Sequence, residues 1–539
     1  MRTKEQNEQL AQLLFPEVKE SPEDVLSRYP ERQTEGMILR FAPSPTGFMH
    51  IGNVYSGLVC TKLAKQTNGV SILRIEDTDK NREIENGVTQ IVKGLKGFGI
   101  EFDEGMISEE ESKGDYGPYL QSKRLDIYKV FAKDLVSKGY AYPCFLKGEE
   151  LEEMREKQEE LKVATGCYGK WAKWRDAEIE DIKHKLESGE EFVVRLYSSG
   201  DPEKAFDFKD LIKGGVTLRE NNMDAVLLKS DGYPTYHFAH PIDDTLMGIT
   251  HVIRGDEWFS SLPLHVELFD KLGFDLLPYA HFTPLMKSEE GKKRKLSKRK
   301  DPEAAVSYYI ERGYPREGII EYLLNIANSN FYDWRIQNPD KNPDEFELKF
   351  DKFNSSGALF DVVKLDNICK NYIATLSAEE VYNSALQWAK DFDEEIASLL
   401  EENKEHCIAI FNIERTGEKI RKDLVKFQDV RDQMAIFFDD LLSKEGVPDI
   451  TERVGEEDQK AILTKYLEIF EIGDSSDEWF DKIKNLSKDL GFEKVGDVAM
   501  VLRVAITHRT QTPDLYQVIR VLGEEKVRER IKNYLDLMI

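Results

Sequence analysis

The hydrophobic positions near the start of the chain predict an α/β sheet that follows a polar segment. Residues 1 to about 35 are polar, mostly compatible with helix, and end in the loop sequence SRYPERQTEG, so we interpret them as an appendage. The run GMILRFA (36–42) predicts a strand, PSPTG predicts a turn, and apolar residues then recur at helical spacing as far as Asn68-Gly69. VSILRI (70–75) predicts a second buried strand. Two strands joined by a crossover helix are expected to be parallel in a helix-covered sheet.

The pattern changes twice further along the chain. A helix is expected over 120–139, and residues 142–215 are interpreted as an insertion with a charged helical stretch, GEELEEMREKQEELK, and a strand, EFVVRLY. The sheet is expected to resume with DAVLLKS, a hairpin at Asp231-Gly232 and PTYHFAH, followed by a strand, loop and helix within 251–273. Beyond about Asp301 helical periodicity dominates. We therefore expect a nucleotide-type α/β fold split by an insertion, with an all-helical C-terminal third.

The charge balance limits how the chain can bind a polyanion. It has 75 basic and 101 acidic side chains among 539 residues, which gives a formal net charge of −26. A field of this sign repels nucleic acid, so any RNA or phosphate site must be a local basic patch. The five cysteines are too few and odd in number for a disulfide framework, and we find no leader sequence. This cysteine usage favours a reducing cytoplasm as the compartment. No apolar run approaches about eighteen residues, so we also expect no membrane span.

The first candidate site is the string RFAPSPTGFMHIGN, residues 40–53. Its prolines and glycine turn the chain away from the strand, and His50 is expected near the start of a helix, where unpaired N–H groups and the helix dipole favour phosphate. Gly52 would let a flat purine approach the backbone closely. For the HIG triplet alone, a polar residue at a helix start is the better interpretation. The complete string favours a nucleotide site.

The second candidate is GKKRKLSKRKD, residues 291–301, where basic side chains crowd together in an otherwise acidic chain. This segment predicts a polyanion patch. Taken alone it indicates a generic contact with RNA or a triphosphate, and a specific catalytic role depends on its neighbours.

Five motifs in one order carry a resemblance to a known family. They are APSPTGFMHIG (42–52), RIEDTD (74–79), DGYPTYHFA (231–239), HVIRGDEW (251–258) and KLSKR (295–299). With these motifs the chain from about Met37 onward closely resembles glutamyl-tRNA synthetase of the bacterial type, a class I aminoacyl-tRNA synthetase. The resemblance leaves out the N-terminal extension and is weakest between 380 and 490.

The resemblance implies a Rossmann-like catalytic domain with an inserted acceptor-binding α+β domain, followed by an all-helical anticodon-binding region. The expected divisions are an N-terminal extension (1–36), the first half of the catalytic domain (37–140), the inserted domain (141–217), the second half of the catalytic domain (218–285), the KLSKR loop with a helical stem-contact domain (286–375), and the anticodon-binding domain (376–539).

The resemblance also implies the reaction and its residues. ATP, accompanied by Mg²⁺, activates L-glutamate to an adenylate, and the glutamyl group passes to the 3′-terminal adenosine of tRNA(Glu). The catalytic residues implied are His50, Lys295, Ser297 and Lys298. Those implied to bind ATP are His50, Gly52, Glu257, Leu285, Met286 and Lys298. Those implied to bind glutamate are Arg40, Ala42, Ser44, Glu76, Tyr236, His240 and Arg254.

Several of these residues have a plainer interpretation that the sequence leaves open. Arg40 and Arg254 could form ordinary salt bridges at strand ends, and Glu257 could be a carboxylate favoured by a helix N-terminus. Leu285 and Met286 could simply pack in the core. His240 departs from the family, in which an amide or an apolar residue is common at this position.

Many relatives bind a structural zinc ion, and this chain has lost most of the residues for it. Relatives bind zinc through closely spaced cysteines in the insertion, but this chain retains only Cys144 and Cys167, and Trp171 stands where another thiolate would be expected. We therefore predict no structural zinc. Arg415 is the candidate tRNA-binding residue, with a solvated helix charge as the alternative. A monomer is usual in the family.

Three other functions compete with this one. A glutaminyl enzyme of the same superfamily typically has PEPNG and a β-barrel anticodon region, whereas this chain has PSPTG and a helical C-terminus. Short paralogues that modify a tRNA base lack the anticodon-binding part. A catalytically silent RNA-binding paralogue should have lost His50, Lys295 or Lys298, and all three are present. Whether the enzyme also charges tRNA(Gln) is open.

Overall fold

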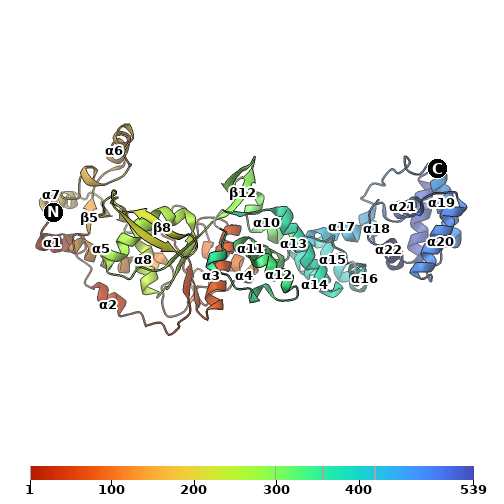
Figure 1. Cartoon of the computed structure of the whole chain (residues 1–539), viewed down its shortest axis with the longest axis horizontal. Helices are drawn as coiled ribbons and strands as arrows, with labels where there is room; N and C mark the ends of the chain where they lie inside the picture. Colours follow the sequence, from red (N-terminus) through yellow and green to blue (C-terminus); the bar gives the residue numbers. More distant parts are fainter. Residues whose placement is uncertain (1, 298, 355–356, 418–419, 539) are drawn as a thin grey trace. The chain divides into compact units, whose positions relative to one another are not determined.

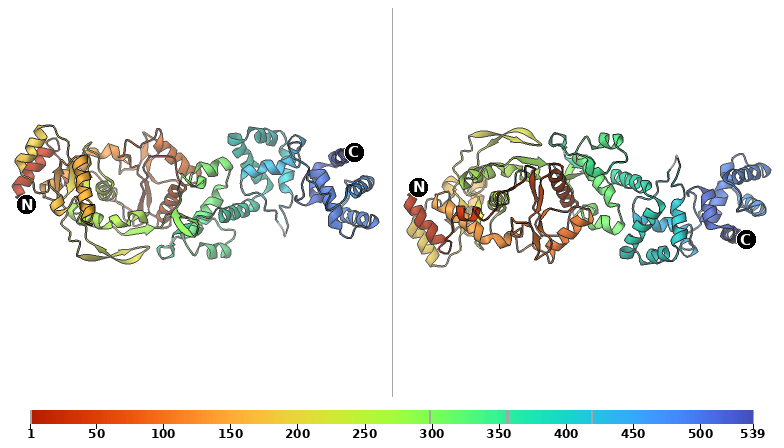
Figure 2. Two further views of the ribbon diagram at one scale, coloured as in Figure 1. Left: turned by 90° about the horizontal axis from the view of Figure 1, so that it is seen from above. Right: turned by 90° about the horizontal axis from the view of Figure 1, so that it is seen from below.

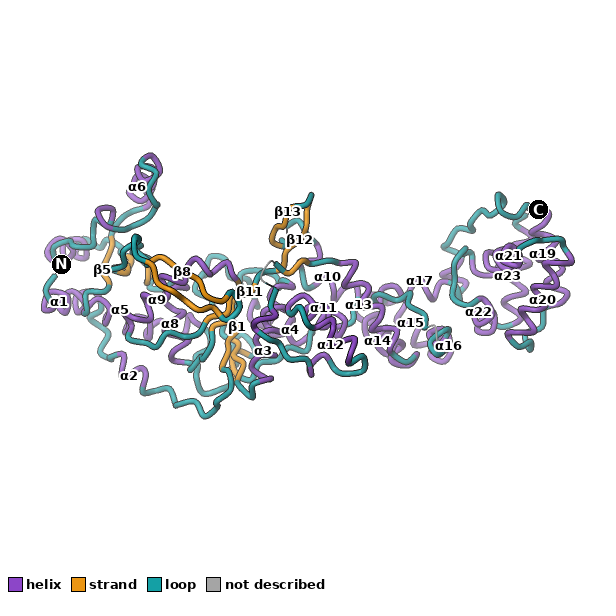
Figure 3. Tube along the Cα trace, viewed as in Figure 1, coloured by secondary structure: helices purple, strands orange, loops and turns teal. Residues whose placement is uncertain are grey.

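The structure is a computed structural model that describes residues 2–297, 299–354, 357–417 and 420–538 (Figure 1). Its contacts divide the chain into two compact units, one formed by Met1–Val306 with Leu323–Asp361 and the other by Ser307–Tyr322 with Val362–Ile539. All strands in the described ranges belong to the first unit, as the colouring of Figure 3 makes visible. No helix in these ranges is long and apolar enough to cross a membrane.

The first unit contains the parallel sheet that the N-terminal pattern predicts. Its strands are β1 (Ile38–Phe41), β2 (Val70–Leu73), β3 (Glu104–Met106) and the short β4 (Ser112–Lys113), in that order. β1 pairs with β2, and β2 with β3, in parallel, and α3 (Ile51–Gln66) is the crossover helix between β1 and β2. The predicted strand, helix and parallel strand are therefore confirmed.

A second parallel sheet, of two strands, lies beside β1. It consists of β10 (Val252–Gly255) and β11 (Tyr279–Phe282), which are parallel to each other and joined by α9 (Leu262–Leu272). The Thr250 N–H donates to the Ile38 carbonyl at 3.0 Å, which holds the start of β10 against the start of β1. The carboxyl ends of β1, β2 and β10 consequently meet at one edge, where open α/β sheets bind their ligands.

The segment PTYHFAH is helical, so the strand that we expected there is wrong. α8 (Tyr236–Leu246) begins directly after Thr235. The buried apolar residues of α8 recur at helical spacing: Phe238, Ala239, Ile242 and Leu246. A seven-residue window cannot separate a period of two from one of about 3.6, and the helical period becomes clear only when the window reaches Leu246.

Residues 141–228, which include the segment that we interpreted as an insertion and the start of the second half of the catalytic domain as we expected it, form a small antiparallel sheet and a separate hairpin. The sheet consists of β5 (Ala141–Cys144), β6 (Val193–Leu196) and β9 (Val226–Leu228), and the helices are α6 (Gly148–Glu160) and α7 (Ile179–Glu187). The hairpin is β7 (Ala205–Asp210) with β8 (Gly214–Arg219), the long yellow ribbon in Figure 2. The charged helix and the EFVVRLY strand predicted for this region are confirmed.

The N-terminal segment is part of the core, so its interpretation as an appendage is wrong. It forms α1 (Lys4–Leu14) and α2 (Pro22–Leu26), and α1 packs along α5 (Leu125–Ser137). Leu10 and Ala11 of α1 are buried in one cluster with the α5 core. The first six residues of α1 are all polar, and its apolar residues lie in its second half, so the polar start concealed the buried stripe.

The remaining elements of the first unit surround the sheet and carry the lysine-rich segment. They are α4 (Gly87–Gly97), β12 (Leu285–Glu289), β13 (Lys292–Lys295), α12 (Phe331–Gln337) and β14 (Ala358–Leu359). β12 and β13 form an antiparallel hairpin, and β14 pairs with β12 in parallel. β14 is a two-residue strand in a region where we expected only helices. Its pairing depends on β12, which is far away in the chain.

The described part of the second unit is helical, as predicted. Its helices are α10 (Ser307–Arg312), α13 (Val362–Thr375), α14 (Ala378–Phe392), α15 (Glu394–Glu402), α16 (Lys404–Asn412), α17 (Val430–Ala435), α18 (Asp439–Leu442), α19 (Glu456–Ile469), α20 (Ser476–Asp489), α21 (Val495–Thr507), α22 (Leu515–Leu522) and α23 (Glu524–Asp536). α11 (Arg316–Ala327) begins in the second unit and ends in the first. From Ile373 onward these helices share one hydrophobic core.

Candidate active site

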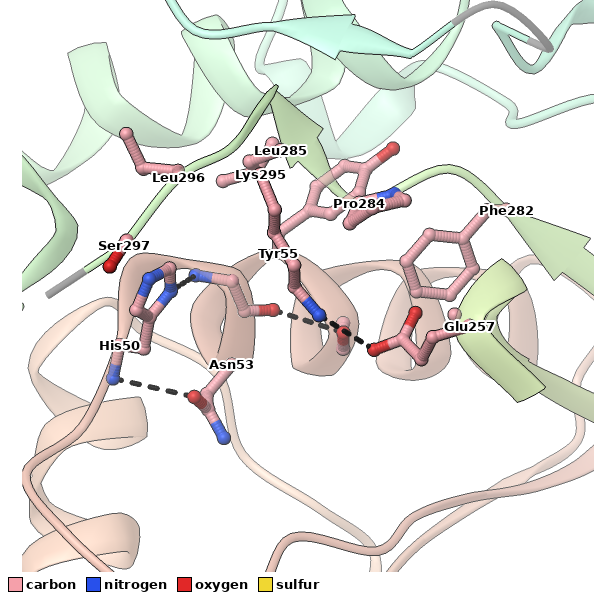
Figure 4. A pocket seen from close by; sticks show the side chains of 13 residues that line it. His50, Asn53, Tyr55, Glu257, Phe282, Pro284, Leu285, Lys295, Leu296 and Ser297 are labelled. Atoms are coloured by element: carbon pink, nitrogen blue, oxygen red, sulfur yellow. Dashed lines mark hydrogen bonds and ion pairs between the residues drawn. The ribbon is translucent and has the colours of Figure 1, made fainter. Parts of the chain in front are cut away.

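A cavity of about 510 Å³ lies between the start of α3 and the β12–β13 hairpin (Figure 4). His50 and Gly52 line it from α3, and Lys295 and Ser297 line it from the end of the hairpin. The structure thus brings the two candidate segments, which are far apart in the chain, to one cavity.

Of the other residues implied to bind ATP, two line this cavity and one does not. Glu257 and Leu285 line it, as the proposed adenosine contacts require. Met286 is not among the described residues that line it, and it pairs across the hairpin with Lys295. Met286 therefore fits the alternative interpretation of a packing residue.

The backbone ties the two segments together. His50 forms an isolated antiparallel bridge with Ala305, which follows the lysine-rich segment. The Val306 N–H donates to the Met49 carbonyl at 3.1 Å. Because main-chain pairing fixes position independently of side-chain rotamers, the two walls of the cavity are held in a defined register.

His50 is the N-cap of α3. Its Nδ1 accepts a hydrogen bond from the Gly52 N–H at 2.9 Å, and its own N–H donates to Oδ1 of Asn53 at 3.3 Å. A neutral imidazole that accepts at Nδ1 carries its proton on Nε2, so His50 presents a donor nitrogen on the other side of its ring. A Cβ atom at Gly52 would lie 3.0 Å from His50 Nδ1, so this glycine leaves room for the ring.

Asp301 organises the end of the lysine-rich segment. Its carboxylate accepts two hydrogen bonds from the Arg294 guanidinium, at 2.6 and 2.8 Å, and a third from the Ser297 N–H at 2.9 Å. These bonds, led by those from Arg294, hold the pKa of Asp301 well below its usual range. Ser297 accordingly fixes the loop through its backbone. Lys298 lies outside the described residues, so its expected role stays a prediction.

One ion pair crosses the cavity. Lys295 Nζ donates to Oε1 of Glu257 at 3.0 Å, and both side chains are about half exposed (Figure 4). An exposed pair of this kind contributes little free energy, on the order of 0–1 kcal/mol. Lys295 can therefore exchange Glu257 for a phosphate at low cost.

A buried charge cluster lies at the carboxyl ends of β1 and β2. Arg40 Nε donates to both oxygens of Asp244, at 2.9 and 3.1 Å, and Arg74 Nη1 donates to Asp244 Oδ1 at 2.6 Å. Asp243 accepts from the Arg124 Nε at 2.7 Å. The alternative interpretation of Arg40 as a salt-bridged strand residue is therefore correct for its Nε. Such buried charges are tolerated because each is paired and hydrogen-bonded.

Glu76 lies at the edge of this cluster. The Arg74 Nη2 donates to its Oε1 at 3.5 Å, and its backbone N–H donates to the Pro43 carbonyl at 3.0 Å. Burial raises the pKa of Glu76 to about 7, although Arg74 and Arg40 pull in the opposite direction. The bond to Pro43 brings Glu76 beside the turn that contains Ala42 and the exposed Ser44.

Arg254 is held by neutral groups. Its Nε donates to Nε2 of His281 at 2.9 Å, and its Nη1 donates to the Tyr236 hydroxyl and lies near Nδ1 of His265, both at 3.1 Å. Its Nη2 donates to the Trp258 carbonyl at 3.3 Å. No ion pair joins Arg254 to a carboxylate in the described part of the chain, so the salt-bridge alternative fails for it. A nearly buried guanidinium with only neutral partners retains its attraction for an anion.

His240 supports the pocket from behind. Its ring has no exposed surface and stacks parallel to Tyr236, with ring centroids 5.7 Å apart. Its Nδ1 lies 2.8 Å from Asp244 Oδ2, and its Nε2 lies 2.8 Å from the Tyr279 hydroxyl. Burial lowers its pKa to about 4, so the ring is neutral. The geometry favours a supporting role over the direct glutamate contact that we expected, because the ring is fully buried and its Nε2 is bonded to Tyr279 within the core.

Arg415 caps helices in the second unit. Its Nε donates to the Phe411 carbonyl at 2.8 Å, and its Nη1 donates to the Ile373 and Leu376 carbonyls, both at 2.9 Å. These carbonyls lie at or near the C-terminal ends of α16 and α13, where acceptors lack intrahelical partners. The contacts favour a structural role, and tRNA binding by Arg415 stays a prediction.

The zinc prediction concerns Cys144 and Cys167. Both thiols are buried, and the neighbouring Cys167 lowers the pKa of Cys144. The Arg195 guanidinium also contacts Cys144. No group of three or more potential ligands gathers within the described ranges. A nearby fixed cation disfavours a divalent metal, so the residues present do not fit the tetrahedral site of relatives, and the absence of zinc stays a prediction.

The sequence did not indicate several residues that line or support the site. Asn53 and Ser56 line the cavity and follow His50 at three-residue steps along α3, a spacing that could have identified them. Tyr55, Phe282 and Pro284 also line it. Two adjacent acids, Asp243 and Asp244, lie in an otherwise apolar helical pattern, which is a signal for buried, paired charges.

Comparison with known proteins gives relatives over nearly the whole chain. The glutamate–tRNA ligase of Clostridium perfringens (strain SM101) is 46% identical over 549 aligned residues, which cover 98% of this chain and 100% of the relative. That of Acetivibrio thermocellus is 46% identical over 546 residues, covering 98% and 99%. A crystal structure of a glutamate tRNA ligase from Elizabethkingia meningosepticum, in complex with its amino acid, superposes with a TM-score of 0.74 at 27% identity, covering 94% of this chain and 100% of the other.

The fold and the site define a class I aminoacyl-tRNA synthetase. Residues 37–333 match the family described as tRNA synthetases class I (E and Q), catalytic domain, and residues 380–535 match the family described as anticodon binding domain. With the relatives above, the chain belongs to the glutamate–tRNA ligase family. The resemblance and the fold class predicted from the five motifs are confirmed.

Proposed function

We propose that this chain joins L-glutamate to tRNA(Glu) in two steps at the cavity described above. Glutamate and ATP form glutamyl-adenylate and pyrophosphate, and the glutamyl group then passes to the 3′-terminal adenosine, which releases AMP. The observation that carries this proposal is the cavity lined by both the His50 segment and the Lys295 segment. The names of its relatives support the choice of glutamate.

The activation step needs positioning and positive charge. A carboxylate oxygen of glutamate attacks the α-phosphorus of ATP, and the bond from that phosphorus to the bridging oxygen of pyrophosphate breaks. No proton transfer is required, so the protein acts by orienting the reactants and stabilising charge on the phosphates. His50 presents Nε2–H, and Lys295 exchanges its ion pair with Glu257 for a phosphate. Lys298 is expected to act with Lys295. Mg²⁺ enters with ATP as part of the substrate.

Glutamate is a dianion at its carboxylates and a cation at its amine, and the pocket contains groups of opposite charge. Arg254 is nearly buried and has neutral partners in the structure, which supports pairing with a substrate carboxylate. Arg40 is expected to contribute its Nη groups, because its Nε is engaged by Asp244. Glu76 is expected to accept the ammonium, and Ser44 and Ala42 to border it. Glutamine would leave a guanidinium without a charged partner, which disfavours it.

The remaining features of the proposal concern partners. The insertion is expected to bind the acceptor end of tRNA and the second unit its anticodon. We propose a cytoplasmic location, which the five free, buried cysteines support, and a monomer, as is usual in the family. Charging assays with purified tRNA(Glu) and tRNA(Gln) decide whether the enzyme charges only tRNA(Glu) or both.

A catalytically silent RNA-binding paralogue is the alternative function, and the presence of His50, Lys295 and Lys298 speaks against it.

The decisive experiment is pyrophosphate exchange into ATP in the presence of glutamate and tRNA(Glu). The unmodified chain is expected to be active. Lys298→Ala is expected to lose about a hundredfold or more of this rate while its affinity for tRNA changes only severalfold, because the lysine acts on the phosphates. Lys292→Ala, on the same hairpin but outside the cavity lining, is the matched control. An inactive unmodified chain, or equal loss of exchange and tRNA affinity in Lys298→Ala, would contradict the proposal.

A further inference from the structure

One carboxylate of the inserted hairpin reaches into the amino-acid end of the site. Asp210 is the last residue of β7 and is almost completely buried. Its Oδ1 accepts hydrogen bonds from the N–H groups of Ile212 and Lys213, both at 2.9 Å. Its Oδ2 lies 2.7 Å from Nδ1 of His281, which belongs to β11 of the catalytic sheet.

His281 connects Asp210 to Arg254 and can do so in one tautomer only. Its Nε2 lies 2.9 Å from Nε of Arg254. A guanidinium nitrogen can only donate, so Nε2 of His281 must present its lone pair. The proton of the neutral ring is then on Nδ1, and this N–H donates a hydrogen bond to the Asp210 carboxylate. The two contacts therefore select the same tautomer.

The histidine also separates the charge of the acid from that of the guanidinium. Burial lowers the pKa of His281, although its bond to Asp210 opposes this, so the ring is neutral near pH 7. A carboxylate in direct contact with Arg254 would neutralise it and weaken its attraction for a ligand anion. A neutral acceptor fixes the guanidinium without that loss.

We propose that Asp210 and His281 are positioning residues for Arg254, which hold its guanidinium in place for a carboxylate of glutamate. Asp210 sets the tautomer of His281, and His281 supplies the neutral acceptor. This inference rests on the proposed function, in which Arg254 binds glutamate. It makes the inserted domain, expected to serve tRNA, a determinant of amino-acid affinity.

A competing explanation is that Asp210 and His281 only dock the hairpin on β11. The variant Asp210→Asn distinguishes this docking explanation from the positioning role. The asparagine oxygen can keep both backbone N–H bonds, and its NH₂ group then faces His281 Nδ1, so that one hydrogen bond and the docking survive. The ring must, however, move its proton to Nε2, which then opposes the Nε–H of Arg254. A docking role tolerates this change, whereas a positioning role does not.

The primary measurement is the glutamate dependence of pyrophosphate exchange in the full-length chain with tRNA(Glu). We expect Asp210→Asn to raise the KM for glutamate about tenfold or more and to leave the KM for ATP within about twofold. Asp207→Asn is the control, because Asp207 lies on the same strand and accepts from Thr217 Oγ1 at the exposed face. A glutamate KM for Asp210→Asn within twofold of that control would overturn the proposal.

Substitution of His281 provides an independent check. His281→Gln keeps an acceptor for Arg254 and is expected to restore most of the affinity that His281→Phe loses. In ¹⁵N-histidine spectra, the signal of His281 is identified as the one that disappears in His281→Gln. This signal should report a proton on Nδ1 in the unmodified protein. In Asp210→Asn it should report a proton on Nε2. A proton on Nε2 in the unmodified protein would overturn the proposal.

If Arg254→Lys raises the glutamate KM and Asp210→Asn does not, this inference alone fails. If the unmodified chain shows no glutamate-dependent exchange, the proposed function fails.

Discussion

At the scale of single residues, the start of α3 depends on a close fit between a ring and a glycine. The Gly52 N–H donates to His50 Nδ1, and a Cβ atom at position 52 would lie 3.0 Å from that nitrogen. That separation is tighter than ordinary contacts of a Cβ atom, so the ring has to shift. In the proposed mechanism His50 donates to a phosphate, and a small shift of such a group has a large effect on rate.

We therefore expect Gly52→Ala to lower kcat for pyrophosphate exchange by about ten- to a hundredfold with little change in melting temperature. Gly148→Ala is the matched control, because Gly148 also lies in the first turn of a helix and has open space around its Cβ position. Kinetics and thermal unfolding of both variants check the prediction. Equal kcat values in the two variants would show that the fit at His50 is unimportant.

The pKa of Glu76 gives glutamate binding a defined pH dependence. Burial raises this pKa to about 7, and the proposed ammonium contact requires the ionised carboxylate. Glu76 becomes protonated as the pH falls through 7, so kcat/KM for glutamate should decrease from pH 8 to pH 6, by about tenfold per pH unit at the acid end. Glu76→Gln should have a lower kcat/KM that varies less over this range. A wild-type profile that is flat between pH 6 and pH 8 would contradict the assignment.

The sequence identified residues whose neighbours in the chain carry the signal, and it missed those whose partners are distant. His50, Gly52, Lys295 and Ser297 belong to local strings, and all four line the cavity. Asp210 and His281 are 71 positions apart, and their relation appears only when β7 lies against β11. No local period or composition encodes such a pair.

At the scale of elements, the chain shows how window length limits the prediction of secondary structure. α3 and β1 were predicted because their periods are complete within their own bounds. α8 was predicted as a strand because PTYHFAH alternates over too short a stretch. β14 has two residues and pairs only with β12, so no pattern of its own could predict it.

The N-terminal helix offers a stability test at this scale. Leu10 has no exposed surface and belongs to the hydrophobic cluster that α1 shares with α5. Leu10→Ala should destabilise the first unit by about 2–5 kcal/mol, because it removes apolar contacts and leaves a cavity. A lower melting temperature and faster proteolysis would be the readout.

Gln9→Ala is the control for that substitution, because Gln9 is exposed on the same helix. It should leave both the melting temperature and the proteolysis rate unchanged. Identical behaviour of the two variants would mean that α1 does not stabilise the unit, despite its burial.

At the scale of the whole molecule, the net charge of −26 predicts that binding of tRNA depends strongly on salt concentration, whereas binding of glutamate does not. Affinity for tRNA must come from local basic groups that displace counterions, so it falls steeply with ionic strength. Between about 50 and 200 mM KCl, the KM for tRNA should rise at least about tenfold, whereas the KM for glutamate should change less than about twofold. Aminoacylation assays over this range check the prediction. A tRNA KM that is insensitive to salt would indicate recognition without phosphate contacts.

The architecture of the whole chain was predictable because it follows from the order of patterns. The local patterns predicted a strand–helix–strand unit, an interruption, a resumed sheet and a helical end, in that order. The family matches confirm the class of fold that this order indicated. The integration of the N-terminal segment was not readable, since its partner helix α5 is more than a hundred residues away.

The hairpin of the insertion has a consequence for how this enzyme can evolve. Asp210 lies at the end of the β7–β8 hairpin and His281 lies on β11 of the parallel sheet, and the Nδ1 of His281 is 2.7 Å from Oδ2 of Asp210. Lineages that replace the histidine should also have lost the acid, and chimaeras that exchange inserted domains should work only when both positions come from compatible parents. If Asp210 and His281 position Arg254 as proposed, the contact between the hairpin and β11 is a place where recombination is constrained by amino-acid recognition.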